Sequence, residues 1–166
     1  MIMARAALVL SVLSCASRAH SAEATTHLRS SEPRLAAVIA SGIQRSPLFR
    51  QLADRLEGSD IIAHVVSDLH PAQQVIGYTT FVIRAGGVRY IRISVDPRLA
   101  DWDLVATIGH ELQHAVEIAN ARGVVDQHTM RTFYVSVGIR GGCDRGETFE
   151  TATAVAVGQR IRREVR

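Results

Sequence analysis

Lysine is absent from this chain of 166 residues, and all 19 basic residues are arginines. Aromatic residues make up only 5% of the sequence, and the arginines are dispersed, with short clusters such as 160–163. Nucleic-acid-binding surfaces usually show a basic tract or basic residues interleaved with aromatic ones, and the sequence contains neither. With a formal net charge of +3, the composition gives no reason to expect nucleic acid as a partner.

Cysteine is also scarce, with two residues in the chain. Residues 1–24 have the order of a secretory signal peptide: a positive end, an apolar run too short to span a bilayer, and small residues. Removing this segment would leave Cys143 alone and so exclude an intramolecular disulfide. Residues 12–15 also resemble a bacterial lipoprotein cleavage box. We therefore expect a secreted or periplasmic protein, attached to a membrane only if Cys15 is lipidated.

The sequence after residue 24 predicts a flexible polar lead-in at 25–32 and then one α+β domain over 33–166. Two N-terminal helices are expected, because Pro33 and Pro47 suit first helical turns and Gly58 suits a helix end. Two C-terminal helices are expected at 127–139 and 147–165.

Three runs between the helices are rich in β-branched residues and predict strands at 60–67, 78–84 and 88–95. Ala85-Gly86-Gly87 predicts a hairpin turn between the last two, so the sheet is expected to be three-stranded and mainly antiparallel. Arg89 and Arg92 are mixed with apolar residues in the last run, which favours a partly exposed edge strand.

The segment His110-Glu111-Leu112-Gln113-His114 has the H-E-x-x-H pattern of zinc hydrolases. Around it, apolar and polar residues fall on opposite arcs of an expected helix. Residues four apart lie one turn apart on the same face, so both imidazoles can reach one metal ion. We predict a Zn²⁺ site with His110 and His114 as ligands and Glu111 as general base. The alternative is a fortuitous match on a solvated helix face.

A catalytic zinc usually has three protein ligands and one water. Positions 117 and 120 are Glu and Asn, which excludes the longer metzincin pattern. Three carboxylates remain candidates: Glu150 early in the expected final helix, Glu147 one turn before it, and Glu117 on the stripe of the histidines. Three ligands in line along one straight helix cannot easily form one face of a tetrahedron around a metal ion. Glu150 is therefore ranked first, Glu147 second and Glu117 third. Glu117 is expected either to support a histidine ring or to be solvated.

The motif, followed by a separate segment with Phe149-Glu150-Thr151, resembles the gluzincin branch of zinc peptidases, the thermolysin-like class. The chain is also similar to small secreted bacterial proteins of unassigned function that carry Glu-Leu-x-His-Ala and a later Phe-Glu-Thr. The resemblance implies a zincin-like fold, a substrate-binding strand before the active helix, ligands His110, His114 and Glu150, and Glu111 as base. The chain departs from the Asn-Glu-x-x-Ser-Asp form of thermolysin, because Ala154 stands where the Asp would be.

These observations predict a zinc-dependent hydrolase that acts on a peptide or protein substrate, with the strand at 88–95 pairing to it. By residue type, the candidates for stabilising the oxyanion are Tyr134, Tyr78, His128 and Arg140. The alternative is a zinc-binding but inactive scaffold or interaction protein of the cell envelope. Small size favours that alternative, whereas the presence of Glu111 favours hydrolysis.

Overall fold

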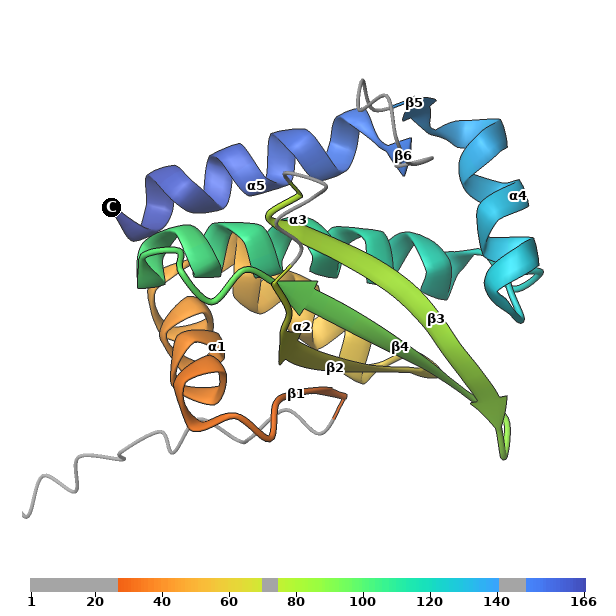
Figure 1. Ribbon diagram of the computed structural model, residues 1–166, viewed down its shortest axis with the longest axis horizontal. Coiled ribbons are helices and arrows are strands. Elements are labelled where there is room, and N and C mark those ends of the chain that lie inside the picture. The colour runs from red at the N-terminus through yellow and green to blue at the C-terminus, as the bar shows by residue number, and fades with distance from the viewer. Residues whose placement is uncertain (1–26, 70–74, 141–148) are drawn as a thin grey trace, which may run out of the picture.

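Helix α3 (Asp101–Asn120) runs through the middle of the fold, with α5 (Ala152–Val165) along one side and the sheet along the other (Figure 1). The structure is a computed structural model that describes residues 27–69, 75–140 and 149–166. Thirteen of the 20 residues of α3 are buried. Its polar side is therefore covered as well as its apolar side, and the two histidines do not lie on a solvated helix face.

Some sequence predictions concern residues that the structure does not describe. The signal peptide expected at 1–24, with Cys15, lies outside the described residues, and so do Cys143 and the candidate ligand Glu147. Among the helices of the described part, none combines the length and the apolar character that a membrane span requires.

The two N-terminal helices follow the prolines as predicted. Helix α1 (Pro33–Arg45) and helix α2 (Pro47–Glu57) each begin at a proline, which has no backbone N–H to leave unsatisfied in a first turn. Ser46 separates them and caps α2, because its hydroxyl accepts a hydrogen bond from the Phe49 N–H at 3.0 Å.

The sheet has four strands and mixed pairing, which corrects the expected three-stranded, mainly antiparallel sheet. The strands are β1 (Leu28–Arg29), β2 (Ile61–Ser67), β3 (Gly77–Ala85) and β4 (Val88–Val95), in the order β1-β2-β4-β3. β1 and β4 pair with β2 in parallel, and β3 and β4 form the predicted antiparallel hairpin. Part of the lead-in expected at 25–32 thus belongs to the sheet, where Leu28 is buried.

The prediction that the 88–95 strand lies at an edge is wrong. β4 lies between β2 and β3, and β3 is the edge strand. Arg89 had suggested exposure, but its side chain is buried and binds Asp60 through two nitrogens at 2.6 and 2.9 Å. Its guanidinium also donates to backbone carbonyls at and just beyond the end of α3, those of Ile118, Ala119, Ala121 and Val124. These contacts compensate the buried charge.

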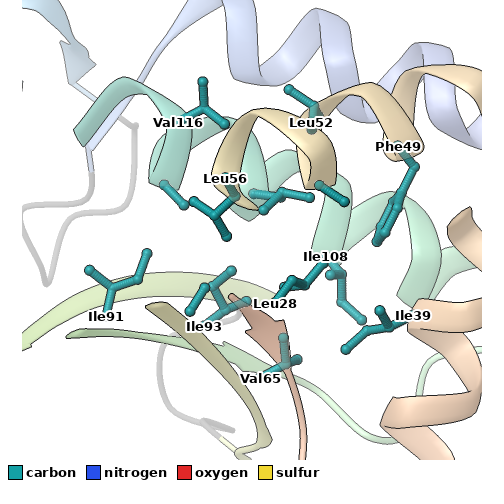
Figure 2. Packing of buried hydrophobic residues seen from close by; sticks show 14 of the residues in the cluster. Leu28, Ile39, Phe49, Leu52, Leu56, Val65, Ile91, Ile93, Ile108 and Val116 are labelled. Atoms are coloured by element: carbon teal, nitrogen blue, oxygen red, sulfur yellow. The ribbon is translucent and has the colours of Figure 1, made fainter. Parts of the chain in front are cut away.

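One hydrophobic core joins the helices to the sheet. Figure 2 shows Phe49, Leu52 and Leu56 of α2 in one cluster with residues of α3 and the sheet. Ile108 of α3 and Ile93 of β4 are fully buried there. The apolar side of α3 is therefore held against α2 and the sheet, while its other side faces α5.

The C-terminal part differs from its prediction in one way that matters for the site. Helix α4 (Gln127–Val137) begins with a capping box between Asp126 and Thr129. A two-stranded antiparallel pair follows, formed by β5 (Ile139–Arg140) and β6 (Phe149–Glu150). The last helix begins at Ala152, not at 147, so Glu150 lies on β6 before the helix.

Replacing Arg89 with Met should lower the free energy of unfolding by about 3 kcal/mol, because Asp60 and the carbonyls at the end of α3 lose their partner. Urea denaturation followed by circular dichroism measures this loss. Arg84→Met is the matched control on the exposed end of β3, and it should change stability by less than about 0.5 kcal/mol. Equal stability of the two variants would contradict the structural role of Arg89.

Candidate metal centre

Three side chains predicted as ligands meet beside α3. His110, His114 and Glu150 each offer a ligand atom, and these atoms lie within 4.8 Å of one another. Glu150 Oε2 is 2.9 Å from His110 Nε2 and 3.9 Å from His114 Nε2. The histidines come from successive turns of α3, whereas the carboxylate arrives on β6 from a distant part of the chain.

The spacing and the chemistry of these three groups fit zinc. Zinc bonds of about 2.0–2.1 Å in a tetrahedron place neighbouring ligand atoms roughly 3.3 Å apart, between the two distances measured from Glu150. Glu150 Oε2 is also buried, and among the described residues no contact to it has the geometry of a hydrogen bond, although His110 Nε2 lies 2.9 Å away. Buried polar atoms are normally satisfied, so this oxygen calls for a partner. A cation placed between it and the imidazoles would supply that partner.

Glu117 takes the supporting position expected of it. Its Oε2 lies 3.0 Å from His114 Nδ1, which leaves His114 Nε2 directed to Glu150. Glu117 Oε1 in turn accepts hydrogen bonds from Thr151 Oγ1 at 2.8 Å and Gln113 Nε2 at 3.1 Å. Such partners hold a ligand imidazole in one orientation and tautomer. The contacts of Thr151 and Gln113 with Glu117 were not visible in the sequence, since each is an ordinary helix-cap or helix residue.

The charges of the cluster favour a cation. Burial lowers the pKa of His114, but Glu117 and Glu150 outweigh burial and raise it to about 10. Burial raises the pKa of Glu150, but His110 and His114 lower it to about 2. The carboxylates thus stabilise positive charge at the imidazoles, whether a proton or a metal ion carries it.

Glu111 is buried next to the ligands, with 4% of its surface exposed. Its Oε2 accepts a hydrogen bond from Thr79 Oγ1 of β3 at 2.9 Å, and its Oε1 lies 4.0 Å from His110 Nε2. Burial raises the pKa of Glu111 above its usual value, and His114 and His110 offset only part of this rise. One carboxylate oxygen is therefore fixed by β3, and the other faces the histidines. The role of Thr79 was not visible in the sequence, where it is one polar residue in a strand.

Two glycines allow other elements to approach α3 closely. A Cβ at Gly77 of β3 would lie 2.6 Å from Thr107 Cγ2 and 3.2 Å from Glu111 Oε1. A Cβ at Gly158 of α5 would lie 3.2 Å from His110 Cβ. Both positions lack a side chain where the backbone passes next to a residue of the H-E-x-x-H motif.

Of the four candidates for oxyanion stabilisation, the three whose side chains the structure describes are not placed at the site as donors. The Tyr134 hydroxyl donates to the His114 carbonyl at 3.1 Å, and its ring packs edge-on against the His114 ring. Tyr78 donates to Asp68, and His128 is exposed at the start of α4. The side chain of Arg140 lies outside the described part. Tyr134 thus supports α3 instead of offering a free hydroxyl.

Comparisons with protein-family models, curated proteins and solved structures found no match for this chain.

Replacing Gly77 with Ala should push β3 away from Thr107 and Glu111, and lower the free energy of unfolding by about 1–3 kcal/mol. Gly123→Ala is the matched control, because a Cβ there meets nothing within 4 Å. Thermal unfolding of both variants measures the difference. A Gly77→Ala protein as stable as Gly123→Ala would contradict the close approach of β3 to α3.

Proposed function

We propose that this protein is a zinc-dependent hydrolase of peptide bonds, with a zincin-like domain of the thermolysin type. The observation that carries the proposal is the position of Glu150 Oε2, which is buried close to two histidine nitrogens without a well-aligned hydrogen bond to either. The buried Glu111 beside it provides the group that a purely structural zinc site would not need. His110, His114 and Glu150 would hold the ion.

The bound zinc would polarise the substrate carbonyl and make a water molecule acidic near neutral pH. Glu111 would take a proton from the attacking water and pass it to the leaving amine. Thr79 would keep the carboxylate turned toward the histidines during both transfers. Glu117 would hold the His114 ring in place, with Thr151 and Gln113 fixing Glu117 in turn.

The edge strand β3 offers a place for an extended substrate, in the role that had been expected of 88–95. The Phe81 N–H points away from β4 and donates to Gln127 Oε1 at 2.9 Å. Backbone groups two residues apart point to the same side of a strand, so Thr79 also presents its N–H and C=O outward. A peptide paired with β3 there would lie beside the carboxylate that Thr79 holds. The Phe81 N–H is the next outward donor along β3, and Gln127 already accepts its hydrogen bond. Pairing with a substrate would therefore end at Phe81.

Purified protein should bind one zinc ion per chain, measured by elemental analysis and by competition with a chromophoric chelator. His110→Ala and Glu150→Gln should each remove this stoichiometric zinc, because each deletes a ligand. Glu117→Gln should weaken zinc binding about 10- to 100-fold by loosening the His114 ring. The control is His128→Ala on the exposed surface of α4, which should bind zinc as the unaltered chain does. Full zinc binding by Glu150→Gln would refute the assigned ligand set.

Glu111→Gln should lower the hydrolysis rate of a quenched fluorescent peptide library by about 10²–10⁴-fold, because the amide cannot take the proton. Zinc should remain bound, and this separates a lost base from a lost metal. Hydrolysis that persists in this variant would exclude Glu111 as general base. Zinc binding without hydrolysis by the unaltered chain would favour an inactive zinc-binding scaffold.

A further inference from the structure

A hollow of about 500 Å³ lies where α2 and α3 end, beside the β3–β4 hairpin. Its wall includes Val116 and Ala119 of α3. At 3.6 residues per turn these lie about 140–160° around the helix from His114, on the opposite side of α3. The hollow is therefore separate from the candidate metal centre, and its volume is in the range of small-molecule sites.

The charged lining of this hollow is strongly one-sided. Four arginines, Arg55, Arg84, Arg89 and Arg122, line it together with one carboxylate, that of Asp60. Both oxygens of Asp60 accept hydrogen bonds from Arg89, whose side chain is 3% exposed. The same guanidinium covers the carbonyls at the end of α3, the negative pole of that helix. The negative groups of the hollow are thus already matched by Arg89.

The other three arginines line the hollow without a hydrogen bond or an ion pair to a described residue, although the charge of Arg84 helps to lower the pKa of Asp60. Arg55 lies in the last turn of α2, Arg84 near the end of β3, and Arg122 just after α3. All three are exposed, and none of them forms a hydrogen bond or an ion pair with a described residue. Like charges gathered from three elements around one hollow repel each other unless an anion lies among them.

We propose that this hollow binds a phosphate group. A guanidinium presents two parallel N–H donors that match a pair of phosphate oxygens, so arginine is the side chain best suited to the task. The excess of three positive charges suits a dianion, and the volume leaves room for a small group esterified to it. The phosphate could belong to a soluble ester or to a lipid headgroup, since both present the same oxygens.

The test uses the full chain and measures binding of inorganic phosphate and glycerol 3-phosphate by titration calorimetry, in buffers matched with sodium chloride for ionic strength. A parallel arm measures co-sedimentation with phosphatidylglycerol vesicles against phosphatidylcholine vesicles. Binding of a soluble phosphate assigns the site to soluble esters. Binding to phosphatidylglycerol vesicles alone assigns it to a lipid headgroup. Binding in neither arm overturns the proposal.

Arg84→Gln and Arg122→Gln should each weaken the binding roughly three- to tenfold, because each removes one charge-assisted contact. The matched control is Arg163→Gln, which removes the same charge from an exposed residue of α5. It should leave the dissociation constant within about twofold of the unaltered chain, since Arg163 does not line the hollow and salt screens exposed charges. Equal weakening by all three variants, or by none, would overturn the assignment to this hollow. The outcome does not depend on zinc binding or hydrolysis.

Discussion

Compensation of buried charge is the constraint on which this structure depends. Glu111 and His114 are almost fully buried on α3, and a buried ionisable group is costly unless another group matches it. Thr79 of β3 matches Glu111, and Glu150 of β6 faces His114. Glu117 of α3 holds the other nitrogen of His114, and Thr151 at the start of α5 holds Glu117 in turn. The elements around α3 are thus held to it by polar contacts as well as by apolar packing.

At the C-terminal end of α3 a buried charge of the opposite sign is also compensated. There the buried group is the cation of Arg89, and the matching groups are Asp60 and the carbonyls that end the helix. Because Arg89 lies on the central strand β4, these contacts join the helix to the sheet. The helix is therefore held around its histidines and at its C-terminal end by charge-assisted hydrogen bonds, which restrict how far its histidines can move.

Much of the framework could be predicted from local sequence signals. Prolines at 33 and 47 and the apolar periods predicted the helices, and the Gly86-Gly87 pair predicted the hairpin, in which both glycines have positive φ. The position of β4 could not be predicted in this way. Arginines mixed with apolar residues are typical of an edge strand, but Arg89 is buried by partners that are 29 to 35 residues away. A local pattern carries no information on such partners.

The amino-acid sequence alone determined that two imidazoles lie one helical turn apart with a carboxylate beside them, since the helix period sets that spacing whatever surrounds it. It also narrowed the third ligand to three glutamates. Only the tertiary structure brought Glu150 to the histidines, on a short strand instead of the expected helix, and placed Glu117 behind His114. The physical reason is that this meeting depends on how α5 and β6 pack against α3, and packing is a property of the whole chain.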